Sequence, residues 1–210
     1  MNITSLQAQL ELRHSLPYNW GVRQNNALDR ATRFAYEIEN FEEILSKINT
    51  LFASSADYGL LRDYTLNRWY NFWSAKGIEY IFSTHPRVLL EPNTRHSLID
   101  FYIDGIAFDH KSSVFPKGYG QALSLAQTHP SSLINWMYNN QSKEQRHHYG
   151  NRLFLILHAA DGAHWKLKSA LSLMHPLIHS YLDILRLDLM PRHTFQRGAE
   201  TMADILWVLK

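Results

Sequence analysis

The sequence feature that most constrains this fold is an Asp-Gly pair between two short hydrophobic stretches, in SLIDFYIDGIAFDHK (residues 97–111). A two-residue type I′ turn needs positive φ at both central residues, and Asp-Gly is among the pairs that supply it. We therefore predict a β-hairpin that turns at Asp104 and Gly105 and that has a single possible register. The predicted pairs are Ile103 with Ile106, Tyr102 with Ala107, Phe101 with Phe108, and Asp100 with Asp109.

The predicted hairpin has two chemically different faces. Opposite residues project on the same face and alternate residues of a strand share a face, so Asp100, Asp109 and Lys111 gather at the open end. Two carboxylates at this separation repel each other, and either Lys111 or a divalent cation would relieve the repulsion. The spacing alone leaves a solvated lysine–aspartate face as the alternative to a metal site. The other face is apolar, and we expect it to pack in the hydrophobic core. It consists of Ile99, Phe101, Ile103, Ile106 and Phe108.

Helices are predicted on both sides of the hairpin. Residues 1–56 are expected to be helical, and in the segment 25–54 apolar side chains recur every three to four positions, which predicts one amphipathic helix. A second helix is expected from Tyr58 to Phe82. Further helical regions are expected over residues 118–148, with a break near Pro130, and over residues 164–190, with a break near Pro176.

Short apolar runs predict the other strands, at residues 87–93 and 151–159, and at 203–210, where a helix is the alternative. The resulting order of elements predicts an α/β (α+β) fold with a central mixed β-sheet of four to five strands flanked by helices. We expect one domain over residues 1–210. Its expected parts are a helical N-terminal region (1–57), a core (58–160) and C-terminal helices with a possible last strand (161–210).

Composition excludes several kinds of site. The chain has no cysteine, which rules out disulfides, zinc–thiolate sites and thiol nucleophiles. Neither a run of about 18 apolar residues nor the apolar segment of a signal peptide is present, so we expect no membrane partner and a cytoplasmic location. The net charge of +2 permits a nucleic-acid partner but does not require one.

The arrangement Asp100 … Asp109-His110-Lys111, on a hairpin that follows a helix and precedes a helix and a strand, resembles the PD-(D/E)xK nuclease superfamily. The resemblance covers residues 62–158 and implies a restriction-endonuclease-like core of a helix, three strands, a helix and a further strand. Extra N- and C-terminal helices would surround this core. Ile99 stands where the family usually has proline, and Asp109 stands where it more often has glutamate. The implied function is a metal-dependent endonuclease that hydrolyses DNA phosphodiester bonds, with restriction or defence as its expected setting.

The resemblance also implies a role for each residue of the motif. Asp100, Asp109 and the backbone carbonyl of His110 would hold Mg²⁺ (or Mn²⁺), which polarises the scissile phosphate and lowers the pKa of a bound water. Lys111 would orient or deprotonate that water and stabilise the charge that develops on the phosphate.

A third carboxylate is expected from the helix before the strands. We assign it to Glu79, a charged residue in the otherwise apolar segment GIEYIF, for which a solvated helix edge is the alternative reading. Glu91 and Asp63 are weaker rivals.

Double-stranded DNA is the expected partner, and a homodimer is the expected assembly. Lys117 follows the hairpin, and Gln145 and Arg146 precede the next strand, where they are candidates for phosphate contacts. An ordinary loop and a solvated helix end are the alternatives. The chain could instead be a catalytically inactive nuclease-fold module for nucleic-acid binding or assembly, or an unrelated α/β protein with solvated hairpin charges.

Overall fold

The computed structural model describes residues 1–20, 24–93, 96, 98–140, 149–195 and 200–210. Contacts group the chain into two compact units. The first unit comprises Met1–Ile78 and Lys168–Ser172, and the second comprises Glu79–Leu167 and Leu173–Lys210. The hairpin and Glu79 therefore belong to the same unit.

The first unit is helical. Asparagine side chains cap three of its helices, because Asn2, Asn25 and Asn40 each accept hydrogen bonds from backbone N–H groups of the first turn. The long helix predicted over residues 58–82 is confirmed. The helices are α1 (Ile3–Leu12), η1 (Arg13–Ser15), α2 (Asn26–Ala31), η2 (Arg33–Tyr36), α3 (Phe41–Phe52) and the part of α4 (Tyr58–Ser83) that ends at Ile78.

The segment 25–54 does not form the single helix that its spacing predicts. The α-helix α2 ends at Ala31, the 3-10 helix η2 ends at Tyr36, and a new helix, α3, begins after Asn40, which has an extended backbone (φ −73°, ψ 132°) and a capping side chain. Side-chain caps of this kind offer the backbone an alternative to a continuous helix. Apolar residues on both sides of the break are buried, among them Ala35, Phe41 and Ile44, so the break changes the direction of the chain without exposing its apolar face.

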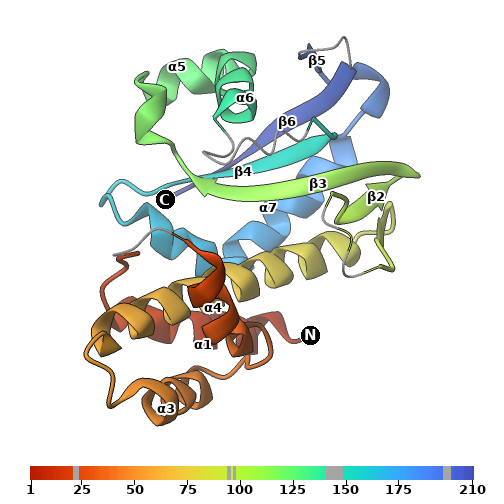
Figure 1. Ribbon diagram of the computed structural model, residues 1–210. Coiled ribbons are helices and arrows are strands. Elements are labelled where there is room, and N and C mark those ends of the chain that lie inside the picture. The colour runs from red at the N-terminus through yellow and green to blue at the C-terminus, as the bar shows by residue number, and fades with distance from the viewer. Residues whose placement is uncertain (21–23, 94–95, 97, 141–148, 196–199) are drawn as a thin grey trace. The chain divides into compact units, whose positions relative to one another are not determined.

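Six strands of the described chain form one mixed sheet in the second unit, in the order β1-β2-β3-β4-β6-β5 (Figure 1). The first three pair antiparallel, β3, β4 and β6 pair parallel, and β5 is antiparallel to β6. The predicted α/β class with a mixed sheet is confirmed. One strand is added to the expected four to five, because β5 is short and has no apolar run. The strands are β1 (Val88–Leu90), β2 (Phe101–Ile103), β3 (Ile106–Val114), β4 (Arg152–His158), β5 (Arg192–Thr194) and β6 (Glu200–Leu209).

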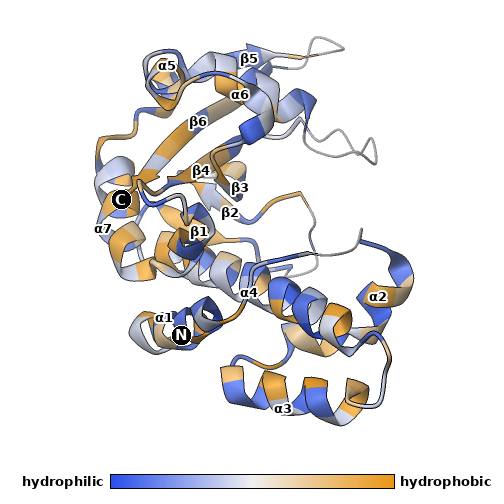
Figure 2. Ribbon diagram, turned by 90° about the vertical axis from the view of Figure 1, so that its left-hand side faces the viewer, coloured by the Kyte–Doolittle hydropathy of each residue, from blue (hydrophilic) through white to orange (hydrophobic). Residues whose placement is uncertain are grey.

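Helices cover both faces of this sheet (Figure 1). On one face lie α5 (Leu123–Thr128) and α6 (Pro130–Asn139), which pack on Phe154 and Ile156 of β4. On the other lies α7 (Leu171–Ile184). Figure 2 shows hydrophobic residues gathered along β4 and β6, as expected for parallel strands covered on both sides. Two short 3-10 helices, η3 (Lys117–Tyr119) and η5 (Leu187–Leu189), also belong to this unit, and a third, η4 (His164–Ser169), belongs to it as far as Leu167.

Helix α7 continues through Pro176, where the sequence predicted a break. A proline inside a helix costs about 3 kcal/mol, because it removes one amide donor and crowds the preceding turn. Met174, Ile178 and Leu182 of the same helix are fully buried, and each such side chain contributes about 1.5–3 kcal/mol. Packing of the apolar face therefore offsets the local cost.

The hairpin has the predicted turn and three of the four predicted pairs; the predicted pair of Asp100 with Asp109 lies beyond the ladder, because β2 begins at Phe101. Asp104 (φ 47°) and Gly105 (φ 83°) both adopt positive φ, as a type I′ turn requires. The Arg87 guanidinium donates two hydrogen bonds to the Asp104 carboxylate, at 2.6 and 3.0 Å, and these bonds hold the side chain of this turn residue in place. Asp104 is thus a turn residue. The observed pairs are Phe101 with Phe108, Tyr102 with Ala107, and Ile103 with Ile106.

We expect Gly105→Ala to lower the free energy of unfolding by about 1–2 kcal/mol, because a Cβ disfavours the left-handed backbone. A Cβ at Gly105 would meet no atom within 4 Å, so the loss of stability would come from the backbone conformation and not from a steric clash. Gly59→Ala is the matched control, because a Cβ at Gly59 would also meet no atom within 4 Å but the residue lies in a helix. This change should raise the free energy of unfolding by up to about 1 kcal/mol, because alanine favours the helix more than glycine does. Urea unfolding of both variants measures the difference, and equal effects would contradict the assigned turn.

Candidate metal centre

Three side chains of the second unit converge beside the hairpin. Glu79 comes from the last turns of α4, Asp100 directly precedes β2, and His110 lies in β3. One potential ligand atom of each lies within 4.8 Å of the other two. Glu79 and Asp100 are half-buried and His110 is buried. We call these three residues the metal-ligand cluster.

A pair of hydrogen bonds joins Asp100 to His110. The carboxylate Oδ2 accepts from the His110 backbone N–H at 2.8 Å and contacts the ring Nδ1 at 2.7 Å. Burial alone would raise the pKa of Asp100, but the hydrogen bonds and the charge of His110 lower it to about 2. Burial would lower the pKa of His110, but Asp100 and the nearby Glu79 raise it. The pair therefore favours a carboxylate beside an imidazolium.

Aromatic packing fixes the His110 ring. Its centroid lies 6.2 Å from the ring of Phe101 and 6.2 Å from that of Phe82, and these two phenylalanines stack on each other at 4.4 Å. Residues 101 and 110 lie on the core side of the hairpin, which explains why a polar imidazole is buried there. Its position is thus set by the core, which leaves the ring little freedom to turn away from Asp100.

Asp109 points to the other side of β3, because successive strand residues alternate. Its parallel neighbour on β4 is Arg152, whose Nε donates to the Asp109 carboxylate at 2.6 Å and whose Nη2 forms an ion pair with it. Arg152 is buried, with its guanidinium over the rings of Tyr138 and Phe154. Burial and the negative charge of Asp100 raise the pKa of Asp109 to about 6 in spite of Arg152.

Lys111 lies two residues beyond Asp109 and is half-buried. Burial and the charge of Arg152 lower its pKa, although Asp109 opposes the shift. Within the part of the chain that the structure describes, the ammonium group makes no hydrogen bond. Lys111 therefore releases its proton more readily than an exposed lysine, and it interacts with the carboxylate of Asp109.

The structure brings the predicted residues together in two groups rather than one. Glu79 lies near Asp100, and the imidazole of His110, which was not among the predicted ligands, is the third side chain of the cluster. Asp109 and Lys111 form the second group with Arg152, and Asp100 lies close to both groups. The charge of Arg152 at the start of the apolar run 151–159 was the one signal that could have predicted its role.

The remaining candidates lie elsewhere. Lys117 is exposed in η3, beyond Val114 at the far end of β3, which itself lies about 16 Å along the strand from Asp109 at the usual strand rise. Gln145 and Arg146 lie outside the described residues. The rivals of Glu79 have other partners, since Glu91 accepts from the Tyr102 hydroxyl and Asp63 from Arg62.

Comparison of this chain with family models, with curated proteins and with solved structures found no match. Among the helices described, none combines the length and the apolar character needed to cross a membrane. What the cluster does must therefore be argued from its own geometry.

We expect Asp100→Asn to lower the free energy of unfolding by about 3 kcal/mol near pH 5.5, because it leaves a buried imidazolium without its counter-charge. The contribution of Asp100, with its lowered pKa, is lost as pH falls below about 4, and that of His110, with its raised pKa, is lost as pH rises beyond about 6.5. The loss should therefore be smaller at pH 9. Urea unfolding in EDTA measures it.

The matched control is Asp188→Asn, which breaks an exposed ion pair with Arg186 and should change stability little at either pH. An equal loss for Asp100→Asn at pH 5.5 and pH 9 would contradict the charged pair.

Proposed function

We propose that this chain is a metal-dependent phosphodiesterase that cuts nucleic acid, with double-stranded DNA as the expected substrate. The observation that carries the proposal is the convergence of Glu79, Asp100 and His110 within 4.8 Å. The half-buried cation Lys111 follows His110 in β3 and interacts with Asp109. Phosphodiester hydrolysis needs this combination, because a polyanionic substrate must be neutralised while negative charge grows on the phosphate.

The connection of the elements supports the proposal. Helix α4 leads into the antiparallel strands β1, β2 and β3, and helices α5 and α6 then return the chain to β4, parallel to β3. This is the order that the resemblance to PD-(D/E)xK nucleases implies. Asp109 lies within β3, as the resemblance implies, whereas Asp100 lies one residue before β2 rather than in that strand.

The donor set of the cluster fits a divalent cation. Carboxylate oxygens suit Mg²⁺ and Mn²⁺, and an imidazole nitrogen suits transition metals better than Mg²⁺. Of the two expected cations, Mn²⁺ is the better match to two carboxylates and one imidazole, and its binding would displace one ring proton of His110, because only the neutral imidazole is a ligand. When bound, the cation would polarise the scissile phosphate and favour the loss of a proton from water.

The side chains would supply the remaining functions. Lys111, whose pKa is lowered by burial and by Arg152, can exchange a proton near neutral pH more readily than an exposed lysine. Its charge would also stabilise the phosphate as negative charge develops. Arg152 holds Asp109 in place and balances its charge, so Asp109 would position Lys111 and Asp100 rather than bind the cation.

A second candidate function is a catalytically inactive module that binds nucleic acid or assembles with a partner. The ion pair between Arg152 and Asp109 favours it, because this pair already neutralises a carboxylate that a nuclease would use for its metal. The homodimer and the cytoplasmic location stay predictions under both candidates.

Cleavage of supercoiled plasmid DNA tests the first candidate. We expect nicked and linear products with Mn²⁺ or Mg²⁺ and none with EDTA. Asp100→Asn and Lys111→Gln should each lower the rate about 100-fold or more, because they remove a ligand and the proton-transfer group. Lys210→Gln, an exposed lysine of the same unit, serves as the matched control and should cut normally.

The two candidate functions predict different results in this assay. Cleavage that survives both Asp100→Asn and Lys111→Gln would refute the assigned mechanism. DNA that is bound but left intact under every metal condition would favour the inactive module.

Electron paramagnetic resonance of Mn²⁺ tests the ligand set separately from activity. We expect a bound Mn²⁺ whose spin-echo modulation carries a nitrogen signal from His110. His110→Gln should remove that signal and weaken binding about 10-fold or more, whereas Asp109→Asn should keep it, because Asp109 lies outside the cluster. A nitrogen-free Mn²⁺ spectrum would show that the cation binds elsewhere.

A further inference from the structure

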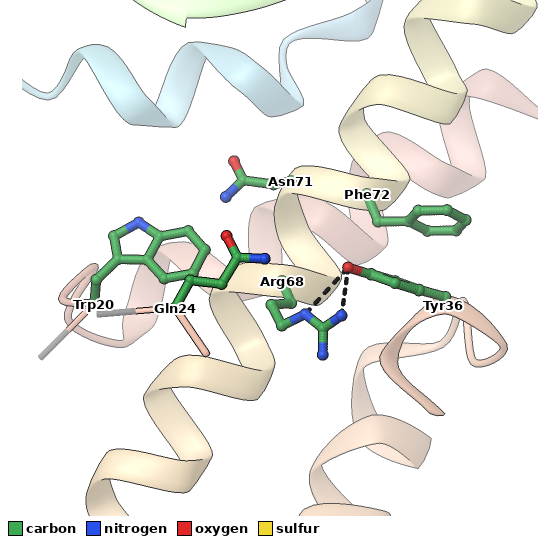
Figure 3. Close-up of a pocket in the computed structure, with 6 residues that line it drawn as sticks. All are labelled: Trp20, Gln24, Tyr36, Arg68, Asn71 and Phe72. Atoms are coloured by element: carbon green, nitrogen blue, oxygen red, sulfur yellow. Dashed lines mark hydrogen bonds between the residues drawn. The ribbon is translucent and has the colours of Figure 1, made fainter. Parts of the chain in front are cut away.

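A pocket of about 280 Å³ in the first unit has no part in the metal centre (Figure 3). Its volume falls at the lower end of the range for small-ligand sites. The side chains come from the segment before α2, from η2 and from the middle of α4. Its lining residues are Trp20, Gln24, Tyr36, Arg68, Asn71 and Phe72.

A buried arginine anchors this pocket. Arg68 is 8% exposed, and its guanidinium donates to the Tyr36 hydroxyl at 2.7 and 3.1 Å, as Figure 3 shows. It also donates to Thr32 Oγ1 at 2.6 Å and to the Asp29 carbonyl at 2.7 Å. Guanidinium has five N–H donors, so one Nη2 hydrogen has no partner among the residues that the structure describes. The pocket thus holds a fixed, almost buried positive charge with a donor to spare.

Two amides present opposite hydrogen-bonding groups. The Asn71 oxygen accepts from the Tyr18 hydroxyl at 3.3 Å and from Lys168 Nζ, so its NH₂ group faces away from them, on the side of Gln24 (Figure 3). The Gln24 NH₂ group donates to Asp29 Oδ2 at 2.9 Å, which leaves its oxygen as an acceptor. A donor and an acceptor are therefore available at the same pocket.

Aromatic rings stand on opposite sides of these polar groups. Trp20 lies on one side, and Tyr36 and Phe72 lie on the other (Figure 3). The last two rings stack with centroids 4.6 Å apart. Aromatic walls around a donor and an acceptor suit a flat heterocycle with polar edges, which is the chemistry of a nucleobase.

A second pocket of about 370 Å³ adjoins the first, because Tyr36 and Arg68 line both. It adds the exposed side chains of Arg30 and Arg33, neither of which forms an ion pair within the described chain. Its acidic residue, Asp29, accepts from Tyr64 and Gln24 and forms an ion pair with Arg68 at 3.5 Å. One carboxylate and three guanidinium groups leave the hollow with a net positive charge, which suits a phosphate. The other lining residue is Asn26.

We propose that the two pockets together bind one unpaired nucleotide, with its base in the pocket of Trp20 and its 5′-phosphate beside Arg30 and Arg33. Arg68 and Tyr36, which line both pockets, would contact the sugar–phosphate junction. This site lies wholly in the first unit and does not depend on the metal centre. It holds whether the chain cuts nucleic acid or only binds it.

Isothermal titration of the full chain with the four common nucleoside 5′-monophosphates, in EDTA, tests the proposal. We expect at least one of them to bind, and to bind more tightly than its nucleoside or ribose 5-phosphate, because base and phosphate each contribute. Trp20→Leu should weaken binding roughly 10-fold or more through lost stacking. Arg30→Ala combined with Arg33→Ala should weaken it by a similar factor and reduce its salt dependence.

Lys47→Ala, a change of one exposed cation on α3, is the control and should leave binding unchanged. Circular dichroism of every variant checks that the fold is retained. Absence of binding by all four nucleotides would overturn the proposal, as would affinities that neither Trp20→Leu nor the double arginine variant changes. Ribose 5-phosphate that binds as tightly as the nucleotides would overturn the base site.

Discussion

The type I′ turn at Asp104 and Gly105 is the constraint on which the second unit depends. Side chains of a strand alternate with a period of two, so a slip of one residue would exchange the two faces of the hairpin. The turn excludes that slip. It puts Phe101 and Phe108 on the core side, where His110 is buried with them, and sends Asp109 and Lys111 to the other side. The register of β3 then aligns Asp109 with Arg152 on the parallel strand β4.

Charge balance explains how the hairpin tolerates so many ionisable groups. Asp100 is paired with His110, and Asp109 is paired with Arg152, so each carboxylate has its own cation on its own side of the strand. Broken pairs of this kind are costly, because a lone charge would remain in a poorly solvated place. The opposite pKa shifts of the two aspartates express the same fact, since the site carries one firmly held negative charge and one that is easily protonated.

The two proposed sites are built by the same physical means. In each, a buried cation is held by several hydrogen bonds and by aromatic rings: His110 between Asp100 and two phenylalanines, and Arg68 between Thr32, Asp29 and Tyr36. Groups restrained in this way lose little entropy when a ligand arrives, which is the advantage of preorganisation. The proposed cation site in one unit and the proposed nucleotide site in the other would both serve a nucleic-acid partner.

Local sequence determined the hairpin, its register, the long helix α4 and the buried strand β4, because turn chemistry and apolar periodicity act over a few neighbouring residues. Glu79 could also be singled out, as a charge in an apolar segment. Local patterns could not show that Asn40 would divide a helix or that burial of α7 would outweigh Pro176. Nor could they choose the partners of the charges. Only the tertiary structure paired Asp109 with Arg152, which lies 43 residues away, and turned the imidazole of His110 toward Asp100, because strand pairing and core packing decide which distant side chains meet.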